Sequence, residues 1–336
     1  MNLPTNKVKN KKSLEMLIMP FFLIFLAMIF TFIEPRFLTT SNLSNLLRQA
    51  AILGLAAFAQ TFVIVSGGID LSTGANAALV TMVTALITKE YGIPVGFSSG
   101  LLLATILGLV NGTLVAYFNI PPFITTVGMF IYARSIAWYI GGGLPIELMP
   151  PGYEFLGGGF LFGIPIPIIL TLLLMPIVHF ILSNTQFGRY LYAIGGNSQA
   201  SRLSGVKVKF YRMLAFGMSG FLAGVTGLVL SSRMVSGQPG VATGIEFQAI
   251  AAVAIGGVSL GGGEGNILRA MVGTLIICTI NNGLNLANVS SYYQQITLGL
   301  IMVLAVVIDN VQRGRLKLPF IHPKQLPQDQ HEPNNG

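Results

Sequence analysis

The groups able to do chemistry are few and scattered in this chain. The three histidines, His179, His322 and His331, lie far apart, and the single cysteine, Cys278, sits in an apolar run. No H-E-x-x-H motif or carboxylate cluster at metal-ligand spacing is present. The string GGGEGN at 261–266 lacks the Lys-Ser/Thr pair that a phosphate-binding loop needs. The sequence therefore predicts no enzyme activity, no metal site and no cofactor bound by this chain.

Ionisable side chains inside the apolar stretches are also sparse. They are Asp70, Arg134, Glu246 and Arg269. A carrier coupled to protons or sodium normally needs such groups within its membrane spans. An ion-coupled secondary transporter is therefore the less favoured alternative, and energy for any transport is expected from a separate subunit.

The amino-acid composition indicates the class of protein in which these side chains are placed. Of the 336 residues, 53% are hydrophobic and 9% charged, and the mean hydropathy is +0.73. Soluble domains carry about 25% charged residues, so this is an all-α integral membrane protein. The long apolar runs predict about ten transmembrane helices, at 14–33, 46–66, 75–88, 97–118, 123–140, 164–183, 213–232, 246–258, 267–286 and 292–308. Span 246–258 is too short to cross alone. Ser41 or Asn42 is the expected cap of the second span. Residues 89–96 are expected to form an outer turn.

The distribution of charge predicts the orientation. Thirteen of the nineteen Lys and Arg residues fall in the arm 1–13, the segment 184–212 and the tail 309–336. The positive-inside rule then places both termini and segment 184–212 in the cytoplasm, on either side of a transmembrane region 14–308. The formal charge of +8 is thus explained by orientation rather than by a nucleic-acid partner.

Segment 184–212 is the longest polar interruption, and it contains five cations and no acid. Its middle, Asn197–Gly205, predicts a short helix with Asn197 as N-cap and Gly205 as its stop. A small basic helix at a membrane face suits docking to another protein. The alternative is a solvated loop that joins two spans.

Two glycine patterns point to close packing. Gly67–Gly74 (GGIDLSTG) matches Gly256–Gly263 (GGVSLGGG), which suggests an internal repeat at two helix breaks. In span 213–232, Gly217, Gly220, Gly224 and Gly227 share one face, which favours helix contacts within the subunit.

Several blocks of this sequence resemble the permease subunits of bacterial ABC importers for monosaccharides, the ribose-type permeases. The blocks are SGGIDLSTG (66–74), NIPPFITTVGM (119–129), FGRYLYAIGGNSQASRLSGV (187–206), AIAAVAIGGVSLGGGEG (249–265) and NNGLNLANVSSYYQQITLGLIMVLAVVID (281–309). The resemblance covers roughly residues 40–310. It implies the ten-helix ABC importer permease fold in the bacterial inner membrane. Distant relatives carry branched-chain amino acids, so such a substrate, or a sugar-like signal, stays an alternative.

The resemblance also implies partners. A cytoplasmic ATPase, which uses ATP and Mg²⁺, would dock between the sixth and seventh spans, and a second permease copy or homologue would complete the pathway. An extracytoplasmic sugar-binding protein would dock on outer loops that include 141–163. The expected ATPase-coupling residues are Asn197, Gln199, Ala200, Arg202, Leu203 and Gly205. Members of the family usually carry an acidic residue where this chain has Ser198-Gln199. This departure could weaken or alter the contact with the ATPase.

A pathway for a hydroxyl-rich solute would suit neutral amides, which both donate and accept hydrogen bonds. The candidate pathway residues are Gln60, Asp70, Asn111, Gln248, Asn281, Asn282 and Gln294. For each amide the alternative is hydrogen bonding between helices, and for Asp70 it is capping of the helix that follows. Phe247-Gln248 replaces the family's usual Leu-Asp, a departure that bears on substrate or gating.

Overall fold

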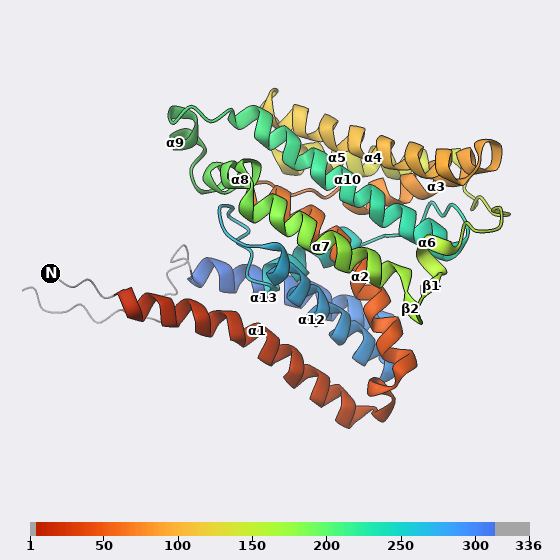
Figure 1. Ribbon diagram of the computed structural model, residues 1–336, viewed down its shortest axis with the longest axis horizontal. Coiled ribbons are helices and arrows are strands. Elements are labelled where there is room, and N and C mark those ends of the chain that lie inside the picture. Colours follow the sequence, from red (N-terminus) through yellow and green to blue (C-terminus); the bar gives the residue numbers. More distant parts are fainter. Residues whose placement is uncertain (1–4, 313–336) are drawn as a thin grey trace, which may run out of the picture.

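The described part of the protein is mostly helical (Figure 1). The structure, a computed structural model, describes the backbone of residues 5–312 and the side chains of residues 19–307 and Val311. The elements are α1 Thr5–Ile33, η1 Pro35–Leu38, α2 Thr40–Val65, α3 Thr73–Tyr91, α4 Ile93–Ala116, α5 Pro122–Ile140, α6 Phe155–Gly158, β1 Phe160–Leu161, β2 Ile164–Pro165, α7 Ile166–Asn184, α8 Gln186–Gly196, α9 Ser198–Leu203, α10 Val208–Met234, α11 Ile245–Ile255, α12 Ile267–Leu286 and α13 Ser291–Gln312.

Helix α2 forms the centre of the molecule. From Ala50 to Val65 every residue of α2 is buried, because α7, α10, α11 and α12 all pack around it. The helices at the periphery, such as α4, α5 and α7, expose apolar side chains instead. Apolar residues therefore lie both in the interior and on the outer surface, as expected for a protein surrounded by lipid.

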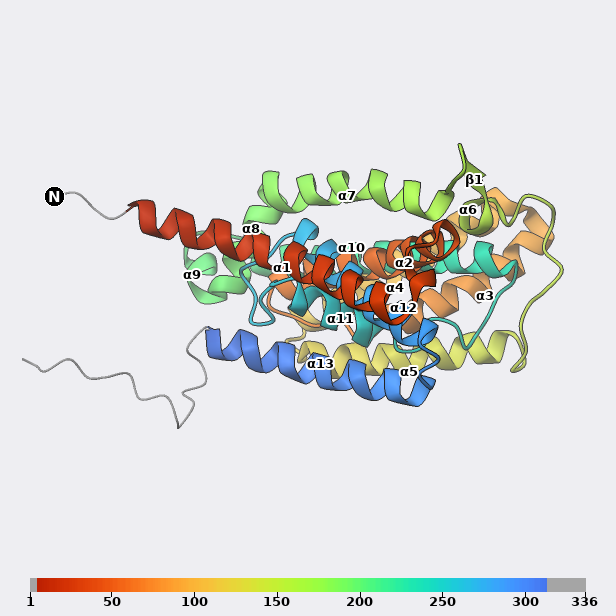
Figure 2. The same ribbon diagram turned by 90° about the horizontal axis from the view of Figure 1, so that it is seen from below.

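The long helices run roughly along one axis, so the molecule has two distinct ends (Figures 1 and 2). One end carries α8, α9, the start of α1 and the end of α13. The other carries the η1 turn, α6 and the small antiparallel ribbon β1–β2. The start of α1 and segment 184–212, two of the basic segments, therefore lie toward the same end, whereas the basic residues of the tail lie outside the described part of the chain.

Glycines let α4 and α10 approach closely, as the sequence predicted for the α10 stripe. A Cβ on Gly108 would lie 2.8 Å from Gly220 Cα, and one on Gly224 would lie 3.0 Å from the side chain of Ala104. Gly217 differs, since its added Cβ would meet only the side chain of Leu109. The stripe is mostly used for packing within the subunit, which confirms the prediction.

The turn predicted at 89–96 is present, but it is much shorter than predicted. Helix α3 continues to Tyr91 and α4 begins at Ile93, so a single glycine, Gly92, with φ of +83°, joins them. The turn can be this short because the two helices lie in backbone contact. A Cβ on Gly96 would lie 2.9 Å from the backbone nitrogen of Thr88, a distance that real Cβ atoms do not show.

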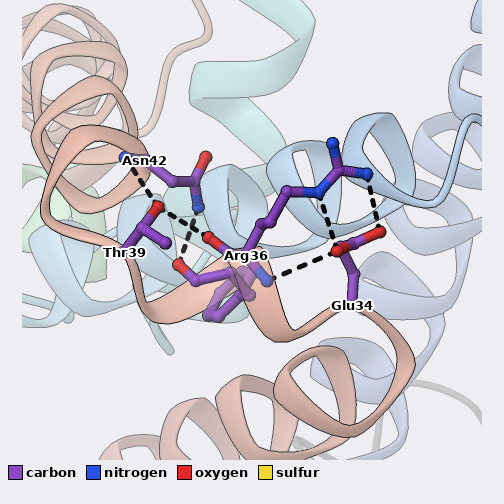
Figure 3. Close-up of polar contacts among 5 residues, drawn as sticks. Glu34, Arg36, Thr39 and Asn42 are labelled. Carbon is purple, nitrogen blue, oxygen red and sulfur yellow. Dashed lines mark hydrogen bonds and ion pairs between the residues drawn. The ribbon is translucent and has the colours of Figure 1, made fainter.

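The predicted cap of the second span is wrong. Helix α2 begins at Thr40 and is capped by Thr39, whose Oγ1 accepts the N–H of Asn42 at 3.4 Å (Figure 3). The cap lies earlier because the preceding η1 turn is ordered by its own ion pair, with Arg36 Nε 2.9 Å from Glu34 Oε1. The hydrogen bond from Arg36 lowers the pKa of Glu34 to about 2, so the carboxylate stays charged well below neutral pH.

Among the described helices, six are long and apolar enough to cross a bilayer by length and composition: α2, α4, α5, α7, α10 and α12. Shorter apolar stretches occur at Met19–Ile33 in α1, in α11, and at Ser291–Val307 in α13. Helix α11 has 11 residues, as its short apolar run suggested. The figure of about ten spans stays a prediction.

The two matching glycine motifs form similar helix ends, but with a shift of one residue. Gly67, with φ of +84°, ends α2, and the next N–H, from Gly68, bonds Val63 O at 3.0 Å. Gly257, with φ of +79°, ends α11, and the N–H of Val258 bonds Val253 O at 3.1 Å. Both are left-handed helix ends of the Schellman type. The structural equivalent of Gly67 is therefore Gly257, not the Gly256 of the sequence match.

Candidate functional site

Helix α9 is set off from its neighbours by hydrogen bonds of its own. Asn197 closes α8 by donating its N–H to Ala193 O at 2.9 Å, and it opens α9 by accepting the N–H of Ala200 on Oδ1 at 2.9 Å. Gly205, with φ of +84°, ends the turn, and Val206 N–H bonds Ser201 O at 3.0 Å. The predicted short helix, its cap and its glycine stop are confirmed. Helix α8, which precedes it, was not predicted.

The outer surface of α9 is uncovered in this subunit. Leu203 is 89% exposed, and Gln199, Ala200 and Arg202 are exposed around it. Ser201 alone faces inward and is buried. An apolar side chain in water beside a cation and a small residue is the usual makeup of a protein contact, because covering it removes apolar area from water.

A contact made of backbone joins the base of α9 to the two helix breaks. Gly195, near the end of α8, lies against Val65 O and Gly263 N, so closely that a Cβ would overlap the Val65 oxygen. Gly263 N–H in turn donates to Val65 O at 3.0 Å. We call Gly195, Val65 and Gly263 the glycine junction. The junction therefore puts the end of α8 in backbone contact with the end of α2 and with the segment between α11 and α12.

Three of the candidate pathway residues, Gln60, Asp70 and Asn111, meet in one buried cluster. Asp70 Oδ1 accepts the N–H of Ser72 at 2.9 Å and its hydroxyl at 2.6 Å, and Oδ2 accepts the hydroxyl of Ser219 at 2.7 Å. Asn111 Nδ2 donates to Ser72 Oγ at 3.0 Å. Gln60 Nε2 donates to Asp70 O. Each of the five side chains is at most 1% exposed.

The cluster explains how a carboxyl group is held inside the subunit. Both of its oxygens accept hydrogen bonds, and the Ser72 N–H that it binds immediately precedes α3. The capping of the following helix that the sequence suggested is not what forms: α3 begins at Thr73, its N-cap Ser72 makes no side-chain cap hydrogen bond, and Asp70 instead accepts the N–H two residues on, as in an Asx turn. Ser72 and Ser219 were missed. Ser72 stands two residues after Asp70 in the block 66–74, which was the available signal, whereas Ser219 is a single serine in a mostly apolar helix with no local signal.

The four remaining pathway candidates lie elsewhere. Asn282 exchanges two amide hydrogen bonds of 2.8 Å with Asn42, and Gln294 Nε2 donates to Val289 O at 2.9 Å. Gln248 and Asn281 are partly exposed, and neither side chain bonds another described residue. Helices α11 and α12 pack antiparallel, with Gly273 against Ala252 O. This register brings Gln248 and Asn281 to within about one helical turn of the same level.

The ionisable pair Arg134 and Glu246 holds the segment before α11. Arg134 Nη1 donates to Pro239 O at 2.9 Å and to Val241 O at 2.8 Å. Glu246 is 1% exposed, and its Oε1 accepts the N–H of Gly244 at 3.1 Å. Arg269 contributes its backbone N–H to the cap of α12, through Asn266 Oδ1 at 2.8 Å.

No group of three or more metal-ligating side chains occurs in the described part of the chain.

Comparison with known proteins identifies the class. The family described as "Branched-chain amino acid transport system / permease component" matches residues 42–306. This chain is a membrane permease and belongs to that family. The match includes the glycine junction, the buried cluster and α9.

Individual relatives cover most of the chain. The ribose import permease protein RbsC of Bacillus subtilis (strain 168) is 41% identical over 297 residues, which is 85% of this chain and 90% of that protein. The D-allose transport system permease protein AlsC of Escherichia coli (strain K12) is 36% identical, covering 87% and 90%. The L-arabinose ABC transporter permease protein AraH of Azospirillum brasilense is 33% identical, covering 89% and 88%. No solved structure matches.

Proposed function

We propose that this chain is the permease subunit of an ATP-driven importer that passes a monosaccharide, ribose or a related sugar, into the bacterial cytoplasm. The observation that carries the proposal is α9, with Leu203 89% exposed and Arg202 beside it, mounted on the glycine junction. The ribose, allose and arabinose permeases among its relatives support a monosaccharide over a branched-chain amino acid.

In this proposal a cytoplasmic ATPase docks on α9, and a second permease copy or homologue completes the pathway. A sugar-binding protein delivers substrate at the opposite end, which carries 141–163 and the β1–β2 ribbon. Leu203 provides apolar contact area, and Arg202 pairs with an acid on the ATPase. Closure of the ATPase then pushes α9, and the glycine junction transmits the displacement to α2 and α11.

The orientation follows from charge. The ten-pass arrangement has both termini cytoplasmic, in the bacterial inner membrane. It is supported by the common end of α9, the start of α1 and the end of α13 and by the positive-inside rule. A reporter fused after Lys317, beyond the described residues, is expected to read cytoplasmic.

Within the pathway, the proposed sugar contacts are Gln248 and Asn281. Their amides are partly exposed and free of partners within the described chain, so both can bond passing hydroxyls. Gln60, Asp70 and Asn111 are assigned a structural role, since at most 1% of each is exposed.

The test is reconstitution of the full transporter in liposomes with ATP inside. Arg202→Glu combined with Leu203→Ala is expected to abolish transport-coupled ATP hydrolysis while the permease stays folded. Arg189→Glu is the matched control, because Arg189 is an exposed cation of the same segment outside α9. Normal coupling in the α9 variant, or full uptake without the ATPase, would overturn the proposal.

A further inference from the structure

Two cavities lie one after the other along α10, the first basic and the second apolar, and we call the two together the groove. At the α9 end, a cavity of about 380 Å³ is lined by Lys207, Tyr117, Tyr190 and Phe210 among others. Further along α10, a second cavity of about 350 Å³ lies between α4, α10 and the α7–α8 junction. Its lining includes Leu109, Ile181, Leu214, Gly217 and Phe221.

The two cavities follow one line along α10. Phe210 lines the first, and Leu214, Gly217 and Phe221 line the second. These residues are spaced by three or four positions and so share one face of the helix. Phe187 of the second cavity and Tyr211 of the first are in ring contact, with centroids 6.3 Å apart. From Phe210 to Phe221 the helix rises roughly 16 Å, close to half of the ~30 Å hydrocarbon core.

The basic end carries uncompensated positive charge beside aromatic rings. Lys207 lines the first cavity, and the exposed Lys209 lines the neighbouring cavity beside α9. The Lys209 ammonium lies 5.7 Å from the centre of the Tyr117 ring, which belongs to the first cavity. Segment 184–212 contains no acid, so neither lysine has an anionic neighbour within it. Tyrosine and lysine together are typical of the membrane–water interface, where phosphate groups lie.

The apolar end is open to the surroundings of the protein. Leu109, Leu214 and Phe221 are only partly buried, and the adjoining faces of α4 and α7 expose Ile106 and Ile177. Gly217 deepens the groove, since a Cβ there would lie 2.7 Å from the end of the Leu109 side chain. A single hydrocarbon chain fits such a channel in length and polarity.

We propose that this groove binds one anionic phospholipid of the leaflet on the α9 side. Its phosphate sits between Lys207 and Lys209, and one acyl chain lies along α10 over Gly217. The bound lipid would pack against α4, α7 and α10, next to the end of the molecule that carries α9. Unlike the docking of a protein to α9, this binding needs neither ATPase nor sugar.

The experiment compares lipids with matched chains on the full-length permease in detergent, with native mass spectrometry as the readout. Phosphatidylglycerol is expected to bind about 30-fold more tightly than phosphatidylcholine, since each lysine near a lipid surface contributes about a factor of five. Lys207→Gln with Lys209→Gln is expected to remove this preference. Lys89→Gln, an exposed cation at the end of α3, should keep it.

The acyl channel has its own variant. Gly217→Leu is expected to weaken both lipids at least tenfold while leaving their ratio unchanged. Gly299→Leu adds the same side chain on α13, where a Cβ meets nothing within 4 Å, and should bind as the native chain does. If Gly217→Leu does not fold, Leu109→Trp fills the channel from the opposite wall.

Three results would overturn the proposal. One is an unchanged lipid preference in the double lysine variant. Another is equal binding by Gly217→Leu and Gly299→Leu. The third is competition by glycerol 3-phosphate at the concentration at which phosphatidylglycerol binds, because that would show a free-phosphate site that makes no use of the channel.

Discussion

After α2 and after α11 the chain leaves a helix through the same left-handed turn, yet the two segments that follow are held in different ways. In the first, Asp70, Ser72, Asn111 and Ser219 form a buried cluster of side-chain hydrogen bonds. In the second, residues 259–266, the main contacts are made by backbone. Ser259 N–H bonds Glu264 O at 3.0 Å, and Gly263 N–H bonds Val65 O at 3.0 Å.

The difference indicates how a repeated turn can serve two purposes. A break fixed by a carboxylate and its three donors resists movement, since each donor would lose its partner in a buried site. A break held by backbone contacts with α2 and α8 follows those elements when they move. We infer that the first break anchors the core and that the second transmits displacement from α9.

The largest expected effect comes from removing the anchor. Asp70→Ala leaves the Ser72 N–H and the hydroxyls of Ser72 and Ser219 without their acceptor, which costs roughly 1–3 kcal/mol per group. We expect a loss of at least about 3 kcal/mol in unfolding by sodium dodecyl sulfate in mixed micelles. Ser259→Ala, at the position that the sequence match pairs with Asp70, removes one 3.3 Å contact to Gly261 N–H and should cost about 1 kcal/mol. Equal losses of unfolding free energy in the two variants would contradict the inference that side chains hold the first break and backbone contacts hold the second.

The glycine junction should be the next most sensitive position. Gly195→Ala puts a Cβ against Val65 O and 2.5 Å from Gly263 N, and backbone atoms cannot rotate away. Overpacking of this kind costs about 1–3 kcal/mol. Gly196→Ala is the control, because a Cβ there meets nothing within 4 Å. In reconstituted transporter, Gly195→Ala should also slow transport per ATP hydrolysed. If both variants behave alike, α8 does not act through this contact.

The features of the fold that depend on residues close together in the chain are predictable from the sequence. Asn197 and Gly205 are strong cap signals, and they place α9 correctly. Apolar runs find the long helices, and α12 begins and ends where its run does, at Ile267 and Leu286. The glycine stripe of α10 predicts close packing but not its partner, α4.

The rest depends on contacts between residues distant in the chain. Ser219 joins Asp70 across 149 positions, and Asn42 joins Asn282 across 240, so neither pair has a local signature. The register of the repeat also misleads, because sequence matching aligns Gly67 with Gly256. The backbone instead selects whichever glycine takes the left-handed conformation, which is Gly257.

That register can be tested by alanine substitution at both left-handed glycines. Gly67→Ala and Gly257→Ala each force a left-handed conformation on a residue with a side chain, and both have room for a Cβ. We expect similar losses of about 1–2 kcal/mol in the same unfolding assay. Gly128→Ala, where φ is not positive and space is open, should be neutral or slightly stabilising. A clear difference between the two turns would show that they are not equivalent.

The smallest expected effect concerns the tie that α8 makes to the second break. The Tyr192 hydroxyl donates to Gly265 O at 2.7 Å, so Tyr192→Phe should cost about 0.5–1.5 kcal/mol. Hydrogen exchange gives the sharper readout: amides at 259–266 should exchange faster, while those at 66–72 keep their rates. Tyr190→Phe, whose hydroxyl accepts only from Gln186 on the surface, is the control. Faster exchange in both breaks would mean that the anchor and the transmitting segment move as one unit.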